Sequence, residues 1–234
     1  MSINELPDPA ALEHVDTWIF DLDNTLYPAA CNLFALIDAR MTIFIERLYV
    51  CDAAAAHRIQ KRYFHEHGTT LSGLMADARI EPRVFLDFVH DIELDRLEHD
   101  ARLVAAVAAL PGRKLVFTNG DVFYAQRVLD RLGLGASFEG IHDIIAMNYV
   151  PKPEAASYAG LCARFEIEPA RALFAEDMVR NLAPAKAIGM TTLWIDNGSE
   201  QGPSGEASVA CPPFVDHRTG RLTDWLHALT REIA

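Results

Sequence analysis

The stretch WIFDLDNTLYP, residues 18–28, decides the fold, because an apolar run gives way there to two acids one residue apart, a polar pair and a proline. Residues 18–22 are typical of a strand buried on both faces of a sheet, and Asp21 and Asp23 stand where that strand should end. Two carboxylates this close repel each other and resist losing water, so a structural role would require a cation between them. The stretch therefore predicts a metal site at the end of a buried strand.

Composition limits the classes of partner. The chain has 234 residues, half of them apolar, which is enough for one large α/β domain or for a domain with a smaller insert. Lys and Arg number 21 against 33 Asp and Glu, the net charge is −12, and no basic stripe occurs. This charge argues against a nucleic-acid polymer or an anionic membrane surface as a partner.

The lack of a recognisable targeting signal and the spacing of the cysteines predict a cytoplasmic protein. Residues 1–15 contain acids and prolines and lack both the basic start and the apolar stretch of a secretory signal. No stretch approaches the roughly 18 continuous apolar residues of a membrane span. The four cysteines show no metal-ligand spacing and are expected to be reduced, at positions 31, 51, 162 and 211.

Short apolar runs alternate with helical patterns along most of the chain. The runs predict strands over residues 17–22, 114–118, 141–147, 172–175 and 191–195. The helical patterns cover residues 122–132, 154–165 and 178–188. This alternation predicts an α/β fold with a parallel sheet, right-handed crossovers and helices on both faces. Such sheets bind their ligands at the carboxyl ends of the strands.

One region breaks the alternation. Residues 30–100 contain no convincing buried strand, and apolar residues recur there at helical spacing, first at Phe34, Ile37, Met41, Phe44, Ile45 and Leu48. An insert that leaves from the end of the first strand would hang over the mouth of the site. We therefore expect a catalytic core made of residues 1–27 and 101–234, and a helical cap domain over residues 28–100.

Polar side chains gather at four of the predicted strand ends. Two acids close the first strand, a Thr-Asn-Gly turn closes the second, a lysine follows the third, and an acidic pair closes the fourth. These residues are Asp21, Asp23, Thr118, Asn119, Gly120, Lys152, Glu176 and Asp177. Because the strand ends of a parallel sheet meet at one edge, we expect them to form one site for an anion and a cation.

The acids suit a magnesium-assisted phosphoryl transfer. Mg²⁺ takes oxygen ligands and usually only one or two protein carboxylates, which Asp21 and Asp177 would supply. The ion would neutralise the repulsion between carboxylate and phosphate, so that one Asp21 oxygen could attack phosphorus in line. Asp23 would protonate the leaving oxygen, later take a proton from water, and offer its backbone carbonyl to the metal.

The remaining groups suit the phosphate itself. The hydroxyl of Thr118 and the backbone amides of Asn119 and Gly120 could hold the non-bridging oxygens. Lys152 would stabilise the negative charge that spreads over the phosphoryl group in the transition state. The expected substrate is a small phosphorylated metabolite.

Four short motifs together resemble those of the haloacid dehalogenase superfamily. They are DLDNT (21–25), TNG (118–120), the lysine of PKP (151–153) and the acidic pair of FAED (174–177). The resemblance implies a Rossmann-like core with a cap, and Mg²⁺-dependent phosphate hydrolysis through an aspartyl-phosphate. It further implies that Asp21 is the nucleophile, Asp23 the acid and base, Thr118 and Lys152 the phosphate binders, and Asp177 a metal ligand.

Longer motifs look like the branch of this family that includes pyrimidine 5′-nucleotidases, which implies UMP or CMP as the substrate. They are DNTLYP (23–28), LFALIDARM (33–41), GTTLSGL (68–74) and YVPKPEAASY (149–158). One departure concerns the metal. Many members place a second acid four residues after the metal-binding one, and Asn181 stands at that position here. Glu176 or Asn181 would then contact the ion, directly or through a water molecule.

Other reactions remain open on the same residues. A phosphatase or phosphomutase acting on a sugar phosphate or another small phosphorylated metabolite would use the same strand ends. A carbon–halogen hydrolase would also use an aspartate nucleophile, but it needs no metal and gains nothing from Asp23 and Asp177. A non-catalytic binding protein would have no use for an intact set of catalytic groups.

Overall fold

A parallel β-sheet organises the protein. The structure is a computed structural model that describes residues 6–199 and 211–233. Neighbouring strands pair in parallel in the order β3-β2-β1-β4-β5-β6. Their bounds are β1 Thr17–Phe20, β2 Arg113–Phe117, β3 Gly140–His142, β4 Ala172–Glu176, β5 Thr191–Ile195 and β6 His217–Thr219. This arrangement confirms the predicted α/β class and the parallel sheet.

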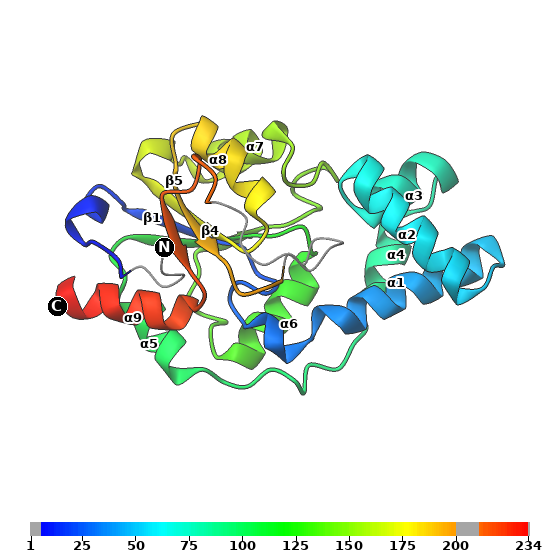
Figure 1. The fold of residues 1–234 in the computed structure, drawn as a ribbon, viewed down its shortest axis with the longest axis horizontal. Coiled ribbons are helices and arrows are strands. Elements are labelled where there is room, and N and C mark those ends of the chain that lie inside the picture. Colours follow the sequence, from blue (N-terminus) through cyan, green and yellow to red (C-terminus); the bar gives the residue numbers. More distant parts are fainter. Residues whose placement is uncertain (1–5, 200–210, 234) are drawn as a thin grey trace.

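Helices cover both faces of the sheet. α7 (Ala155–Phe165) and α8 (Leu182–Ala187) lie on one face, and α5 (Ala101–Ala109), α6 (Val122–Leu132) and α9 (Leu222–Ile233) lie on the other (Figure 1). The direction of winding reverses between β1 and β4, because the chain first adds β2 and β3 on one side and later β4 and β5 on the other. The carboxyl ends of these two central strands therefore flank the crevice in which such sheets bind ligands.

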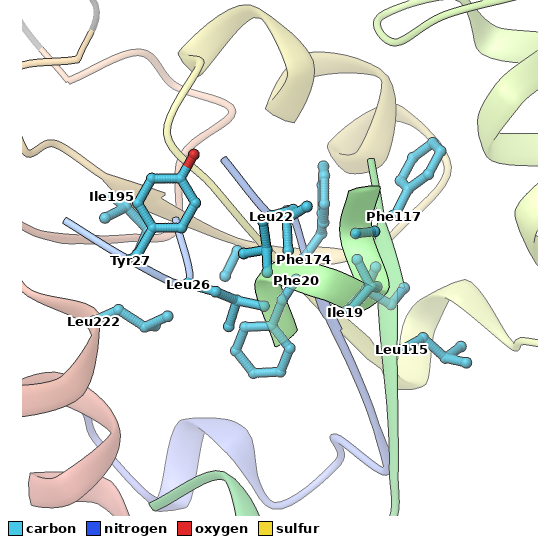
Figure 2. Packing of buried hydrophobic residues seen from close by; sticks show 14 of the residues in the cluster. Ile19, Phe20, Leu22, Leu26, Tyr27, Leu115, Phe117, Phe174, Ile195 and Leu222 are labelled. Carbon is cyan, nitrogen blue, oxygen red and sulfur yellow. The ribbon is translucent and has the colours of Figure 1, made fainter. Parts of the chain in front are cut away.

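The centre of the sheet is buried on both faces, as the apolar run of the first strand predicts. Trp18, Ile19 and Phe20 are at most 1% exposed. The apolar cluster continues beyond the end of β1 through Leu22, Leu26 and Tyr27 (Figure 2). Burying an isoleucine or phenylalanine side chain contributes roughly 1.5–3 kcal/mol. The segment that carries the two acids is therefore anchored on both sides of each acid.

Four helices follow β1 and form a helical lobe, which we define as residues 34–89. They are α1 Phe34–Tyr49, α2 Ala53–His67, α3 Thr70–Ala78 and α4 Pro82–Val89. α1 packs against α2 and α4, and α2 packs against α3, to one side of the sheet (Figure 1). Residues 28–100, all of which are described, contain no strand. The helical insert after the first strand is confirmed, whereas its boundaries and its role as a cap stay predictions.

Local signals set the ends of the lobe helices. Asp52 Oδ1 accepts a hydrogen bond from Ala55 N at 2.8 Å at the start of α2, and Thr69 Oγ1 accepts from Ser72 N at 3.1 Å at the start of α3. Pro82 occupies the first position of α4, where a missing N–H costs nothing.

Within the described ranges, no helix is both long enough and apolar enough to cross a membrane.

The third strand is shorter than predicted. We expected residues 141–147, but β3 ends at His142. The Asp143 carboxylate accepts hydrogen bonds from Val122 N and Ala146 N, both at 2.9 Å, so the chain turns instead of continuing along the sheet. Of the apolar residues that follow, Ile144 and Met147 are buried in this turn.

Other departures lie in the last third of the chain. The helix expected over residues 178–188 is divided into a 3₁₀ turn, η4 (Val179–Asn181), and α8. Neither β6 nor α9 was predicted, and residues 200–210, between β5 and β6, lie outside the described residues. Further 3₁₀ turns are η1 Ala10–Leu12, η2 Ala29–Cys31 and η3 Pro169–Arg171.

Buried His142 makes the stability of the fold depend on pH. The ring is 2% exposed and lies against Phe117 and Phe165. Burial, and then the charge of Arg164, lowers the pKa of His142 to about 4. Because the pKa of an unfolded histidine is about 6.5, the unfolded chain binds more protons than the folded one below that pH. Stability is therefore lost as the pH falls from about 6.5 to about 4.

We expect His142→Leu to remove this acid-dependent loss. Between about pH 7 and about pH 4.5, the difference in free energy of unfolding between variant and wild type should shift by on the order of 2 kcal/mol in favour of the variant. Urea titrations at the two pH values measure the shift. His57→Leu, at an exposed position, should show no shift. Parallel pH dependence in wild type and His142→Leu would contradict the assignment.

Candidate active site

A buried lysine joins the carboxyl ends of three neighbouring strands. Lys152 is 1% exposed. Its ammonium group donates to Asp21 Oδ1 at 2.6 Å, to Glu176 Oε2 at 2.7 Å and to the Phe117 carbonyl at 2.8 Å. Phe117 ends β2, Asp21 follows β1 and Glu176 ends β4, and these strands are adjacent in the sheet. All three ammonium hydrogens thus have acceptors, as a buried lysine requires.

The segment that carries Lys152 is fixed by Asn119. The Lys152 amide donates to Asn119 Oδ1 at 2.8 Å, and Asn119 Nδ2 donates to the Lys152 carbonyl at 3.2 Å. The rings of Phe117 and Phe174 lie 5.1 and 5.3 Å from the ammonium nitrogen and form apolar walls. The side chain of Asn119 therefore positions the lysine. The predicted phosphate contact of Asn119 concerns its backbone amide and is compatible with that role.

The turn after β2 is closed by a hydrogen bond between two of the predicted phosphate binders. Thr118 is 1% exposed, and its Oγ1 accepts from Gly120 N at 3.0 Å. Asp121 then caps α6 by accepting from the amides of Phe123 and Tyr124 at 2.9 and 3.0 Å. Contact of the Gly120 amide with a phosphate would require the bond to Thr118 to open. The phosphate-binding role of both residues stays a prediction.

Three carboxylates crowd around the lysine. Asp21, Glu176 and Asp177 are buried, and each offers an oxygen within 4.8 Å of the others. Burial, and then the charge of Glu176, raises the pKa of Asp21 to about 7, against the opposing effect of Lys152. The same two causes raise the pKa of Asp177 well above its usual range. Burial acts to lower the pKa of Lys152, but the two acids that it contacts outweigh burial and raise it to about 12.

A divalent cation fits this surplus of negative charge. Both oxygens of Glu176 already accept hydrogen bonds from the protein. Asp21 Oδ2, by contrast, has a longer contact of 3.3 Å with the Thr25 hydroxyl. Asp21 is therefore better placed than Glu176 to serve as a ligand, and the metal contact of Asp177 stays a prediction. Carboxylate oxygens are the hard ligands that Mg²⁺ prefers.

Asn181 follows Asp177 by four residues, in η4. It is 2% exposed, and its Oδ1 has no hydrogen-bond partner within the part of the chain that the structure describes. Its backbone carbonyl accepts from the Tyr158 hydroxyl at 2.6 Å. A buried oxygen without a partner suits a water molecule or a cation, which is compatible with the predicted contact between Asn181 and the ion.

Asp23 has surroundings of a different kind. Its Oδ1 accepts from the Tyr27 hydroxyl at 2.6 Å and from the Tyr124 hydroxyl at 2.7 Å. Its carboxylate does not belong to the three-acid cluster. Burial, and then the charge of Asp23, raises the pKa of each tyrosine well above its usual range, so both hydroxyls remain protonated donors. The predicted metal contact of Asp23 concerns its backbone carbonyl and stays a prediction.

Three residues of the site were missed in the sequence. Thr25 and Tyr27 lie within the decisive stretch of residues 18–28, but their spacing does not show that their hydroxyls turn back to the acids. Tyr124 lies on α6, where helical periodicity indicates burial but names no partner. A buried tyrosine usually needs a hydrogen-bond acceptor for its hydroxyl, which is the signal that could have found both rings.

Arg180 is a further residue that was not predicted. It lies three residues after Asp177, donates to the Gly68 carbonyl at 3.3 Å and stacks 4.4 Å above the ring of Phe64. Gly68 and Phe64 belong to the end of α2. Arg180 therefore joins the loop after β4 to the helical lobe.

The comparison with known families places the chain in a family of hydrolases. Residues 15–189 match the haloacid dehalogenase-like hydrolase family, and the chain belongs to that family. It is similar to Phosphate metabolism protein 8 of Saccharomyces cerevisiae, with 27% identity over 203 residues that cover 80% of this chain and 62% of that protein. This chain thus spans less than two thirds of the length of that relative.

Solved structures share the fold. The HAD phosphatase from Thermococcus onnurineus has a TM-score of 0.61 and 16% identity, with 94% of this chain and 98% of that chain covered. The L-2-haloacid dehalogenase from Xanthobacter autotrophicus has a TM-score of 0.51 and 20% identity, with 80% of this chain and 79% of that chain covered. Identities this low establish the fold alone. The two structures confirm the predicted fold, and the reaction has to be inferred from the residues of the site.

We expect Mg²⁺ to stabilise the folded protein. Because the pKa values of Asp21 and Asp177 are raised on folding, the metal-free protein loses stability as the pH rises from about 4 through about 7. An ion that binds only the folded state counteracts this loss, by about 2.7 kcal/mol at about 100 times its dissociation constant. Thermal unfolding at about pH 7.5, with and without Mg²⁺, measures the effect. Asp177→Asn should lose the rise in melting temperature that Mg²⁺ causes, and Asp95→Asn, at an exposed position, should keep it. An undiminished rise in Asp177→Asn would contradict the assignment of Asp177 as a ligand.

Proposed function

We propose that this chain is a Mg²⁺-dependent phosphomonoester hydrolase that works through an aspartyl-phosphate on Asp21. The observation that carries the proposal is Lys152 Nζ, held 2.6 Å from Asp21 Oδ1 inside a cluster of buried acids. Such a carboxylate can approach an anionic phosphate only where positive charge is supplied, by Lys152 and by a divalent ion. The names of two similar proteins, Phosphate metabolism protein 8 and a HAD phosphatase, support phosphate chemistry.

Asp21 acts as the nucleophile. One of its oxygens lies against Lys152 and the other against Thr25, so the first carboxylate of the motif has two differently placed oxygens. When bound, Mg²⁺ supplies neutralisation of the charge on the carboxylate and on the phosphate. Attack of Asp21 on phosphorus breaks the ester bond and leaves the phosphoryl group on the protein. Lys152 stabilises the developing negative charge, and Thr118 holds a phosphate oxygen.

Asp23 serves both half-reactions. It gives a proton to the leaving oxygen as the ester bond breaks, and it takes a proton from the water that then hydrolyses the aspartyl-phosphate. Its position outside the acid cluster supports this role, because it is not needed to pair with Lys152. Hydrolysis releases phosphate and restores Asp21 and Asp23 to their starting states.

Dehalogenation is the weaker alternative. The fold does not separate the two reactions, since an L-2-haloacid dehalogenase shares it. A carbon–halogen hydrolase, however, gives no role to Asp177 in the buried cluster or to a proton donor at Asp23. A phosphomutase would require the aspartyl-phosphate to be shielded from water. A non-catalytic protein would bury this costly set of acids without using it.

The proposed substrate is a pyrimidine nucleoside 5′-monophosphate. The motif at residues 68–74 supports it by resemblance to nucleotidases, and the Gly68 carbonyl of that motif contacts Arg180 in the loop after Asp177. The segment therefore lies near the loop that carries a proposed metal ligand. That location suits a segment that recognises the leaving group.

Substitution of the two acids should separate the half-reactions. We expect Asp21→Asn to lower phosphate release at least about a thousand-fold, while urea unfolding shows a folded protein. Asp23→Asn should accumulate phosphorylated protein during turnover of an aryl phosphate, whose leaving group needs no proton, and intact-protein mass spectrometry detects it. Asp95→Asn is the exposed control. Substantial activity in Asp21→Asn would refute the covalent route.

A phosphate-release screen tests the substrate. With Mg²⁺ present, we expect UMP and CMP to be hydrolysed at least about tenfold faster than AMP or common sugar phosphates at equal concentration, a difference that a few recognition contacts can supply. Removal of the metal by EDTA should stop all of these reactions. Faster hydrolysis of AMP or a sugar phosphate would keep the reaction and reject the pyrimidine assignment.

A further inference from the structure

Two tyrosines hold the same oxygen of Asp23. The hydroxyls of Tyr27 and Tyr124 both donate to Oδ1, at 2.6 and 2.7 Å. No hydrogen bond to Oδ2 is found in residues 6–199 and 211–233. The two rings come from either side of the helical lobe in the sequence, since Tyr27 follows β1 closely and Tyr124 lies on α6. The carboxylate thus has one oxygen with two donors and one oxygen available for other chemistry.

Both rings are firmly placed. Tyr27 is 2% exposed and Tyr124 is 1% exposed. The Tyr124 ring stacks on His90, with ring centroids 4.4 Å apart and an interplanar angle of 12°. His90 Nδ1 lies 2.5 Å from Asp121 Oδ2, and Asp121 Oδ1 also accepts from the Tyr124 amide. The side chain of Asp121 therefore fixes both the helix that carries Tyr124 and the ring that covers it.

The hydrogen-bond count decides where a proton can reside. A carboxyl oxygen offers two acceptor sites, and on Oδ1 both face hydroxyl donors. We propose that Tyr27 and Tyr124 are positioning residues that keep Oδ1 as an acceptor, so that Oδ2 is the oxygen that carries the proton transferred in catalysis. This inference rests on the proposed function, in which Asp23 is the acid and base.

The proton balance follows from this geometry. In the first half-reaction the Oδ2–H bond breaks, its proton goes to the leaving oxygen as the ester P–O bond breaks, and the Asp21–phosphorus bond forms. The two hydroxyls then stabilise the carboxylate that Asp23 has become. In the second half-reaction water attacks phosphorus, its proton returns to Oδ2, and the Asp21–phosphorus bond breaks. The sum is one ester and one water converted into one alcohol and one phosphate.

The leaving group distinguishes this role from simple packing. An alkyl ester needs a proton on its leaving oxygen, whereas the p-nitrophenolate of p-nitrophenyl phosphate leaves without one. Loss of a proton donor therefore slows the alkyl ester selectively, while distortion of the site slows both esters. The ratio kcat/KM is the proper measure, because it covers the steps up to release of the alcohol and excludes later hydrolysis of the phosphoryl-protein.

We expect the double variant Tyr27→Phe, Tyr124→Phe to lower kcat/KM for an alkyl phosphate at least about tenfold more than for p-nitrophenyl phosphate. General acid catalysis contributes about 10²- to 10⁴-fold, and only part of it should be lost, because Asp23 itself remains. Each single variant, which keeps one hydroxyl on Oδ1, should show an intermediate ratio. The singles also preserve the test should the double variant fail to fold.

Tyr63→Phe provides the matched control. Tyr63 is as buried as Tyr124, and its hydroxyl bonds the Tyr49 hydroxyl at 2.7 Å within the helical lobe. This variant loses a buried hydroxyl without touching Asp23, so the ratio of the two esters should equal that of the wild type.

Two failures are distinguishable in this experiment. If the wild type releases phosphate from neither ester in Mg²⁺, the proposed function is wrong and the inference falls with it. If the wild type hydrolyses both esters but the tyrosine variants lower both kcat/KM values equally, or lower neither, the function stands and the positioning role is overturned.

Discussion

The structure depends on one buried ammonium group. Lys152 holds together acids that otherwise repel one another, and removing one partner of a buried ion pair typically costs about 3–5 kcal/mol because the other charge is left uncompensated. Its acceptors follow or end three adjacent strands, so the ammonium is fully bonded only when β2, β1 and β4 are in register. The bonds that assemble the site are therefore the bonds that lock the carboxyl edge of the central sheet.

That constraint separates two acids that are neighbours in sequence. Asp21 lies in the cluster with Lys152, and Asp23 lies outside it under two tyrosine hydroxyls. The backbone turns directly after Asp23, at Asn24, which has a positive φ of 58°. A carboxylate beside a buried ammonium suits the nucleophilic attack proposed for Asp21, and one beside neutral donors suits the proton transfer proposed for Asp23.

The sequence predicted the central strands well because their signals are local. The strand over residues 191–195 was placed as observed, and those over 114–118 and 172–175 were placed within one residue. The strand over residues 141–147 was predicted too long, because its apolar run could not show that Asp143 bonds the start of α6 and ends β3 at His142. β6 is three residues long and polar, and it exists through pairing with β5, a tertiary contact with no local signature.

The same distinction between local and tertiary signals explains which parts of the site could be predicted from the sequence. An acid at a strand end is visible in the sequence, but its role is set by donors that arrive from elsewhere in the fold. Glu176 illustrates this, because one of its oxygens accepts from Lys152 and the other from the Met178 amide, so both are used within the protein. Tyr124 lies 101 residues from Asp23, so no spacing rule could join them. The chemistry of each acid is therefore a property of the assembled sheet edge, and the sequence names only the candidates.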